Sequence, residues 1–584
     1  MIDLNERNFE MIIIKRGLKL GSVASCVLLM MSLMGITSLL RASEPGVSGS
    51  SDLGKYLINL PFTMPEMKEP QFPNTSVTIM DFGAIGDGLT MNTQAFANAI
   101  QKCVQSGGGT VVVPPGTWLT GPIKLESNIN LHLERGALVL FSKRFEDFPL
   151  VAGYDGKSKK YVVTPPVYAY RATNIAITGA GVFNGSGEAW RYVKKDKLTD
   201  QQWKELVKSG GVISADGKEW WPSKAAMEGE SYLKTLEKSG KEVTAEDYAK
   251  AREFLRPDLI RFIQCDGVLL DGPSFENSPR FHVHLVQSEN IIIRNINIYT
   301  EWYAQNGDAL DISACRNVLV YKSTINAGDD GICIKPANIS QRQKEGPACE
   351  NIVIEDCLVH HAHGGFVIGS ETSGGAKNIY VKNCIFSGTD VGLRFKSLRG
   401  RGGLIENIYV DSVRMNSIAQ EAILFDLYYG DESPDVRATT KKDLKTTEPV
   451  TDKTPRLQNF SIKNIFCDGA NRAMLINGLP EMPVKNIVLE NITIRAKTGV
   501  LCVNADSISI KNATILPDGG PIVIVNQSTN ILLNTVTYPQ RADAFLSVMG
   551  DKTQNIQVGN VDLTKAKEKA VFDEKASKES VIYK

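Results

Sequence analysis

A short apolar unit recurs along most of the chain. Each copy opens with an asparagine and continues with strand-like apolar residues, as in residues 290–293 and 317–320. The other copies open at Asn174, Asn351, Asn378, Asn407, Asn486 and Asn530. Successive copies are often 27 to 34 residues apart, which is typical of a solenoid whose coils each supply one strand to several parallel sheets. We therefore predict an all-β fold, a right-handed parallel β-helix, with the asparagines stacked at one corner and hydrogen-bonded to turn backbone.

An amphipathic helix is predicted ahead of this repeat. The apolar residues with helical spacing are Ala95, Phe96, Ala99, Ile100 and Cys103. Three glycines at positions 107–109 end this segment, and residues 110–113 begin a strand. Because the first coil of a solenoid otherwise exposes its core, we expect this N-terminal helix to cap it.

Two stretches interrupt the period. Residues 187–256 contain four of the six tryptophans and two predicted helices, which open at Thr199 and Thr244. Thr199 is followed three residues later by Gln202, a capping-box pattern. We predict a helical insertion here. Residues 428–457 are rich in Lys, Thr, Asp and Glu, and we predict a polar loop, most simply a solvated excursion from the coil.

Basic residues precede a long apolar run at the N-terminus. A basic cluster at residues 15–19 is followed by an apolar run over about residues 20–40. This order is typical of an export signal, so residues 1–43 are predicted to be a signal peptide and the mature protein periplasmic or extracellular. The run is also long enough to span a bilayer, so an uncleaved anchor stays open. Residues 44–76, rich in Gly, Ser and Pro, are predicted to be a linker or loosely attached arm, which leaves 77–584 as the β-helix domain.

Charge and cysteine usage exclude several partners. The 65 basic residues balance 65 acidic ones, so no overall field recruits nucleic acid or, after signal cleavage, a membrane. The ten cysteines include no Cys-x-x-Cys pair, so neither a structural zinc nor a redox motif is predicted. Cys357 and Cys384 fall at equivalent positions of adjacent copies, and we interpret them as apolar filler.

Acidic residues cluster between strands in the middle of the repeat. Asp308 and Asp329 lie 21 residues apart, close to one minimal coil, and Asp330 adds a third carboxylate. Adjacent coils place such residues about 4.7–4.9 Å apart, so one member should hold a proton at neutral pH. An acid and a base are what glycoside hydrolysis needs. The same residues could instead bind Ca²⁺ in a lyase, or form an ordinary turn, since Gly-Asp-Asp-Gly is a common turn sequence.

Cations and a histidine follow the acidic cluster. Arg394 and Lys396 are two residues apart, so they project from one face of a strand. Such a pair is usually solvated, but next to an acidic cluster it could hold the carboxylate of an acidic sugar. His363 could order the proton on a neighbouring aspartate. His360 and His361 precede it, but no matching ligand spacing supports a metal site.

Four ordered groups carry a resemblance to a known family. They are residues 306–308 (Asn-Gly-Asp), 329–330 (Asp-Asp), 362–364 (Ala-His-Gly) and 394–396 (Arg-Phe-Lys), after an opening at residues 81–88. Together they resemble the polygalacturonases of glycoside hydrolase family 28, over roughly residues 77–540. The resemblance implies hydrolysis of α-linked galacturonate in pectin, with inversion and without a metal or other cofactor.

The same resemblance implies roles for individual residues. Asp329 would be the general acid, and Asp308 with Asp330 would activate water. His363 would tune the acid, and the cation pair at 394 and 396 would bind the sugar carboxylate. The departures from the family pattern leave these reactive side chains in place; they are Gly307, Ala309, Ala362 and Phe395.

The neighbouring sugar and the mode of attack are less constrained. A rhamnogalacturonan hydrolase on the same fold, a calcium-dependent pectate lyase and a non-catalytic carbohydrate-binding β-helix all stay open. Because the insertion at 187–256 lies upstream of Asp308, it could wall off one end of the groove, which favours exo-acting cleavage. Arg399 and Arg401 would then add charge for a terminal carboxylate, and Asn306 is also predicted to contact substrate.

Overall fold

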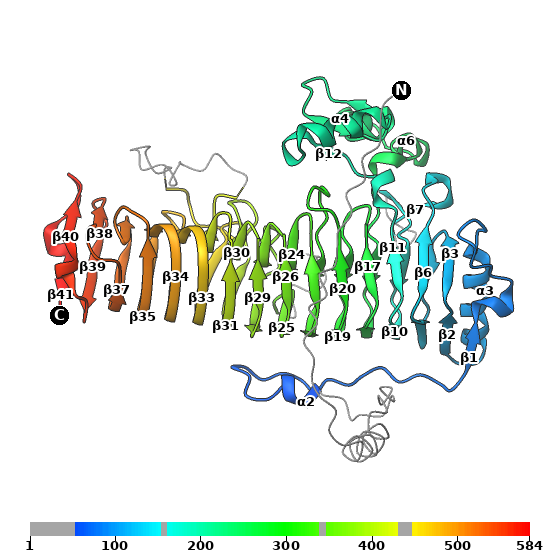
Figure 1. Ribbon diagram of the computed structural model, residues 1–584, viewed down its shortest axis with the longest axis horizontal. Helices are drawn as coiled ribbons and strands as arrows, with labels where there is room; N and C mark the ends of the chain where they lie inside the picture. The colour runs from blue at the N-terminus through cyan, green and yellow to red at the C-terminus, as the bar shows by residue number, and fades with distance from the viewer. Residues whose placement is uncertain (1–52, 154–159, 338–345, 430–446) are drawn as a thin grey trace, which may run out of the picture. The chain divides into compact units, whose positions relative to one another are not determined.

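Parallel strands pair coil upon coil through the chain. The structure is a computed structural model that describes residues 53–153, 160–337, 346–429 and 447–584. Within the unit Lys55–Lys584, each strand of the main sheet system pairs in parallel with the equivalent strand of the next coil (Figure 1). The fold is a right-handed parallel β-helix, which confirms the prediction. The predicted signal peptide lies outside the described residues.

Each coil contributes strands to three stacks. The first, here called the site stack, contains β4 (Ile123–Lys124), β9 (Val167–Tyr170), β15 (Ile260–Ile263), β18 (Val283–Val286), β21 (Leu310–Ser313), β24 (Asp330–Lys335), β27 (Gly364–Ile368), β30 (Val391–Lys396) and β32 (Glu421–Asp426). The second, the asparagine stack, contains β1 (Ser76–Thr78), β2 (Gly109–Val113), β5 (Ile129–Leu133), β10 (Thr173–Gly179), β16 (Asp266–Asp271), β19 (Glu289–Arg294), β22 (Arg316–Tyr321), β25 (Cys349–Glu355) and β28 (Ala376–Lys382).

The third stack turns the chain back toward the next coil. It contains β3 (Gly116–Thr120), β6 (Ala137–Phe141), β11 (Val182–Asn184), β17 (Ser274–Glu276), β20 (Asn297–Tyr299), β23 (Thr324–Asn326), β26 (Leu358–His360) and β29 (Ile385–Ser387). Later coils use longer strands that bend from one stack into the next, namely β31 (Leu404–Asn416), β33 (Arg456–Asn477), β34 (Val484–Val503) and β35 (Ala505–Pro517). The last coils are β36 (Val523–Asn526), β37 (Thr529–Thr537), β38 (Ala542–Met549), β39 (Gln554–Gly559), β40 (Ala566–Phe572) and β41 (Val581–Tyr583).

The repeated asparagines form ladders along one corner. Asn290, Asn317, Asn351 and Asn378 all adopt a left-handed backbone with φ of 53–57°, a conformation that asparagine tolerates better than most residues. The side-chain amides of Asn317, Asn351 and Asn378 each donate to the amide oxygen of the asparagine on the preceding coil, at 3.1–3.3 Å, and that of Asn290 donates to Asp266 Oδ1 at 2.7 Å. The predicted stacking is correct, but these amides bond to side chains of the preceding coil, not to turn backbone. The bends between strands therefore repeat in register.

A helix closes the N-terminal end of the solenoid. Helix α3 (Thr93–Gln105) buries the five apolar residues that the sequence pattern selected, among them Phe96 and Cys103. They join the same continuous core as the first strands. The predicted cap is confirmed.

The insertion is helical, as predicted, and contains one helix that the pattern missed. Its helices are α4 (Asp200–Lys208), α5 (Lys224–Lys238) and α6 (Ala245–Lys250), beside a small antiparallel sheet of β12 (Val193–Lys194), β13 (Val212–Ile213) and β14 (Glu219–Trp221). Both α4 and α6 begin with capping boxes, at Thr199 and Thr244. Helix α5 was missed, although Ser223 caps it.

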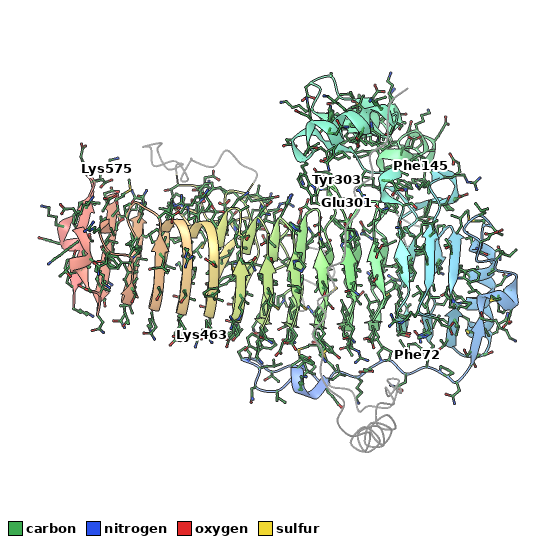
Figure 2. All side chains as sticks on the ribbon, viewed as in Figure 1. Phe72, Phe145, Glu301, Tyr303, Lys463 and Lys575 are labelled. Carbon is green, nitrogen blue, oxygen red and sulfur yellow. The ribbon has the colours of Figure 1, made fainter. Side chains whose placement is uncertain are left out.

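The insertion has its own small core, which reaches the coil. Trp203 and Trp220 pack with Val193, and Tyr303 from the loop between β20 and β21 packs against them (Figure 2). Trp190 instead joins the solenoid core, where its ring meets the ring of Phe145 edge-on with centroids 4.5 Å apart. The insertion therefore packs against the loop that precedes the acidic cluster.

The described part of the predicted arm is packed on the coil. Tyr56 is buried, with its ring centroid 4.2 Å from that of Tyr321, and Glu69 pairs with Arg294. The segment from Lys55 onward is thus not loosely attached. Helix α2 (Leu53–Tyr56) and the antiparallel pair β7 (Leu150–Ala152) and β8 (Tyr161–Val163) complete the described elements outside the stacks, 3-10 turns aside. Of the predicted polar loop, residues 430–446 lie outside the described residues.

The described cysteines agree with the filler interpretation. All nine are free and buried. Cys357 and Cys384 lie in register on adjacent coils, each directly before the paired strands β26 and β29. Within the described ranges, no helix is long and apolar enough to cross a membrane.

Candidate active site

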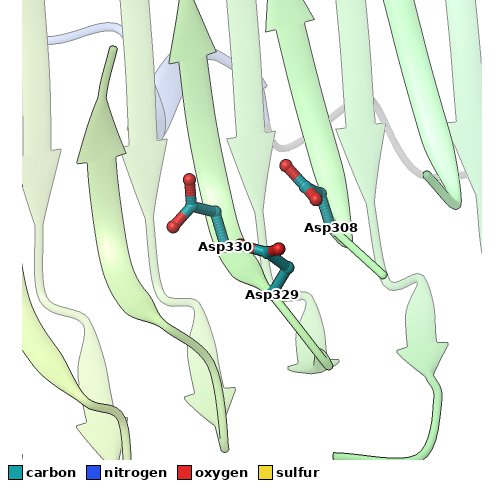
Figure 3. A group of neighbouring side chains, drawn as sticks. All are labelled: Asp308, Asp329 and Asp330. Atoms are coloured by element: carbon teal, nitrogen blue, oxygen red, sulfur yellow. The ribbon is translucent and has the colours of Figure 1, made fainter. Parts of the chain in front are cut away.

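Three carboxylates from two adjacent coils meet beside the starting ends of two neighbouring strands of the site stack, β21 and β24 (Figure 3). Asp308 lies just before β21, Asp329 lies just before β24, and Asp330 is the first residue of β24. Their nearest carboxylate oxygens all lie within 4.8 Å of one another. Gly328 makes this approach possible, because a Cβ at that position would lie 2.4 Å from the carbonyl oxygen of Ala304. The structure thus brings together the predicted acidic cluster.

The register of the stack adds residues that the motifs did not reveal. In the paired strands, His284 of β18 is aligned with Asp311 of β21, and Asp311 with Cys333 of β24. Lys335, at the end of β24, places its Nζ 3.1 Å from Asp308 Oδ2 and 3.3 Å from Asp311 Oδ1. Sequence reasoning missed both Asp311 and Lys335. Their signal was the alternation within each strand: each is the sequence neighbour of a core isoleucine, Ile312 or Ile334, so its side chain points away from the apolar core.

Burial separates the acidities of the carboxylates. Desolvation raises the pKa of Asp308 well above its usual range, and the charges of Asp311 and Asp329 add to this shift against the opposing effect of Lys335. Desolvation likewise raises the pKa of Asp311 to about 7, although Lys335 again opposes it. Asp308 and Asp311 therefore hold protons far more readily than ordinary aspartates.

Asp330 is held in the opposite state. Burial alone would raise its pKa, but Lys396, Arg394 and Lys335 outweigh burial and hold the pKa well below the usual range. Lys396 Nζ lies 2.7 Å from Asp330 Oδ2, and Arg394 Nη1 lies 3.4 Å from Asp330 Oδ1. The cluster therefore contains carboxyl groups whose pKa values are shifted in opposite directions.

Asp329 is the most accessible of the three. Its side chain is 17% exposed, against 4% for Asp308 and 2% for Asp330. His363 Nδ1 lies 2.9 Å from Asp329 Oδ1, and the backbone N–H of His363 donates to the carbonyl oxygen of Asp329 at 2.7 Å. These two bonds fix the histidine ring beside the acid that faces solvent.

The insertion supplies a cation to the edge of this site. Lys197 Nζ lies 3.4 Å from both His363 Nε2 and the carbonyl oxygen of Gly328. Burial lowers the pKa of Lys197, and the charges of Asp329 and Asp390 act against that shift. Asp390 Oδ2 also lies 3.8 Å from His363 Nε2. No sequence motif pointed to Lys197, because it is 132 residues away from Asp329 in the chain.

The remaining predicted substrate residues lie in ion pairs or turns. Arg399 makes two hydrogen bonds to the Glu481 carboxylate, at 2.7 and 2.9 Å, so its charge is already compensated. Arg401 lies 3.9 Å from Glu371 and is partly exposed. Asn306 Oδ1 accepts a hydrogen bond from the guanidinium of Arg256 at 2.8 Å.

The cations also bear on metal binding. The spread of the three carboxylates is one that a divalent ion could bridge. However, the ammonium groups of Lys335 and Lys396 lie within 3.1 and 2.7 Å of Asp308 and Asp330, and they would repel a divalent ion. This donor set fits Ca²⁺ poorly.

Comparisons with known proteins point to one enzyme family. The family profile Glycosyl hydrolases family 28 matches residues 197–451, and the profile Rhamnogalacturonase A/epimerase, pectate lyase-like matches residues 76–135. The solved exopolygalacturonase of Thermotoga maritima is 31% identical, with a TM-score of 0.62, over 76% of this chain and 93% of that chain.

Two sequence relatives differ in their described mode of attack. An exo-poly-α-D-galacturonosidase of Dickeya chrysanthemi is 25% identical over 69% of this chain, which spans 64% of that protein. An endo-polygalacturonase of Pectobacterium carotovorum is 27% identical over 65% of this chain and 82% of its own length. The chain belongs to glycoside hydrolase family 28, the family of the polygalacturonases, and it is a glycoside hydrolase.

Proposed function

We propose that the protein hydrolyses α-linked galacturonic acid in pectin, with inversion at the anomeric carbon. The observation that carries this proposal is the cluster of three carboxylates, in which cations lower the pKa of one member and burial raises the pKa of another. Cleavage of a glycosidic bond needs an acid for the leaving oxygen and a base for water. Here the candidate acid and the candidate bases lie within 4.8 Å of one another, on two adjacent coils.

Accessibility supports Asp329 as the general acid. It is the one member of the cluster that a glycosidic oxygen can approach without displacing buried side chains. In the substrate-free site burial raises the pKa of Asp308, so the cluster holds a proton-binding carboxyl directly beside Asp329. His363 orients the acid.

The deeper carboxylates are suited to holding a water molecule. Both oxygens of Asp330 face cations, and Asp308 favours its protonated form, so neither is a free nucleophile. Their oxygens are closer than the roughly 6.5–9.5 Å carboxyl separation usual in inverting enzymes. Inversion is therefore inferred from the two carboxyl groups that cannot act as free nucleophiles, and the separation does not support it.

The cation pair has two tasks in this proposal. Arg394 also donates to the carbonyl oxygen of His363 at 3.3 Å, and it lies partly exposed above Asp330. Its exposed edge can bind a sugar carboxylate. Lys396 is buried against Asp330, so its main role is to keep that carboxylate ionised.

We also propose that the protein is exported. This rests on the basic residues followed by an apolar run within residues 1–43.

We further infer exo-acting cleavage. Lys197 brings the insertion to within 3.4 Å of His363, and the insertion core packs on Tyr303. The insertion would then close one end of the substrate-binding groove and leave a pocket for a chain end. An endo-acting enzyme instead needs a groove that is open at both ends.

The test is a time course on polygalacturonate, with rhamnogalacturonan as the alternative substrate. Galacturonate monomer is expected to accumulate early while viscosity barely falls. A rapid fall in viscosity with mixed oligomers would contradict exo action. Turnover of rhamnogalacturonan alone would contradict the substrate, an unsaturated product lost with chelator would indicate a lyase, and binding without turnover would indicate a carbohydrate-binding protein.

A further inference from the structure

A cavity of about 580 Å³ separates the insertion from the coil. One wall comes from the insertion, including Tyr192 and Trp221, whose rings stack with centroids 4.3 Å apart. The opposite wall comes from the coil, including Arg280 and Asn306. The cavity is therefore framed by aromatic surface on one side and polar groups on the other, which is the usual lining of a sugar site.

Arg256 is the buried cation of this cavity. Its guanidinium donates to the carbonyl oxygen of Gln305 and to Asn306 Oδ1, both at 2.8 Å, and it lies over the Tyr192 ring. Both hydrogen-bond acceptors are neutral, and no carboxylate of the described residues is within ion-pair distance. Burial lowers the pKa of Arg256 to about 10, so it stays charged at neutral pH. A buried charge without a counter-ion is costly, and an anion would offset that cost.

The other arginines of the cavity differ from Arg256 in this respect. Arg261 is paired with the buried Asp258, and Arg280 Nε lies 3.8 Å from the same carboxylate. Arg280 is 41% exposed and can add charge at the cavity mouth. Two acidic residues of the insertion also line the cavity, and each has a partner: Glu219 accepts from the Trp221 indole, and Glu230 pairs with Lys234.

Contacts link the lining of the cavity to the carboxylate cluster. Asn306 lines it and is two residues before Asp308. Arg280 and Lys335 both lie over the ring of Phe281, at 4.1 and 5.1 Å, and Lys335 contacts Asp308. Burial raises the pKa of Tyr192, and the charge of Asp329 adds to this shift, which places the cavity wall within electrostatic reach of the acid.

We propose that this cavity is a second uronate subsite, in which Arg256 binds the carboxylate of the terminal sugar of the substrate while the Tyr192 and Trp221 rings face the sugar. The proposal rests on the proposed function, since it assumes an oligogalacturonate. It also explains how a chain end would be recognised. Arg394 binds a carboxylate near the scissile bond, and Arg256 binds one in the closed end.

Trigalacturonates with a single methyl ester at each of the three sugars in turn test this subsite. The ester removes one carboxylate charge at a known position. For the wild type, the ester on the terminal sugar in the cavity is expected to raise KM about 10- to 100-fold. Arg256→Gln is expected to raise KM for free trigalacturonate by a similar factor, and to show little further loss on that one ester. Arg256→Lys should recover part of the affinity.

The controls separate this role from a structural one. Arg256 also holds the turn before Asp308, and damage to that turn would lower kcat/KM by the same factor on all four substrates; that result would overturn the proposal. Arg171→Gln, at a surface site where the guanidinium bonds Gln264, should leave every KM unchanged. If the wild type does not cleave free trigalacturonate, the proposed function itself fails and this inference with it.

Discussion

Asp329→Asn is expected to lower kcat by about 100- to 10,000-fold, because an amide cannot protonate the leaving oxygen. The free energy of unfolding should change by less than about 1 kcal/mol, since Asp329 is partly exposed and lies outside the buried ion pairs. Steady-state kinetics and thermal unfolding on the same preparation measure both quantities. KM should stay close to the wild-type value, because the amide keeps the shape of the side chain.

A matched control shows whether the loss is specific. Asp543→Asn changes an exposed aspartate on the late strand β38, many coils away from the site. Its partner, Lys567, lies on β40. Its activity and stability should both match the wild type. Near-wild-type turnover by Asp329→Asn would mean that another carboxyl, with Asp308 first in line because of its raised pKa, donates the proton.

Lys396→Met is expected to damage both stability and catalysis. Asp330 would lose its closest counter-ion and keep Arg394 and the weaker influence of Lys335, so unfolding should become easier by at least about 2 kcal/mol. The pKa of Asp330 would rise, its proton would block water activation, and kcat should fall by about 100-fold or more. Because the base must be ionised, the acid limb of the kcat profile should move to higher pH.

A second variant distinguishes the two possible tasks of this lysine. In Lys396→Met combined with Asp330→Asn, no buried carboxylate is left without its cation, and the Arg394 guanidinium that loses Asp330 is partly exposed. Most of the lost stability should therefore return while activity stays low. Lys463→Met, in an exposed pair with Glu490, is the control and should change stability little. A variant Lys396→Met that only raises KM, with unchanged stability, would show that the lysine binds the sugar carboxylate and does not hold Asp330.

Periodicity predicted the solenoid because the same pattern repeats in many coils. The asparagine corners were predictable for the same reason, since a left-handed residue is needed at each bend. Helix α5 was missed because no capping box marks its start, and only Ser223 accepts from its backbone. The arm beginning at Lys55 was misjudged since its composition is loop-like, yet Tyr56 and Glu69 find partners on distant coils.

The motifs predicted the carboxylates but not their environment. Three residues, Asp308, Asp329 and Asp330, were found because they lie between predicted strands and because Asp308 is about one coil length away from the other two. Lys335 and Lys197 were not, because one depends on strand register and the other on how the insertion packs. The charge of Arg399 was assigned to substrate, whereas its partner Glu481 is 82 residues further along the chain. Ion pairs between distant segments leave no local signal.

The central claim is that the carboxylate cluster hydrolyses a galacturonide with water as the nucleophile. Proton NMR of the first products formed from trigalacturonate tests it most directly, because the anomeric signals are read before mutarotation. The account predicts a saturated sugar that is initially β-configured, the inverted product of an α-linkage. An α-configured first product would show that a carboxylate attacks the sugar, and an unsaturated product would show elimination; either would contradict the account.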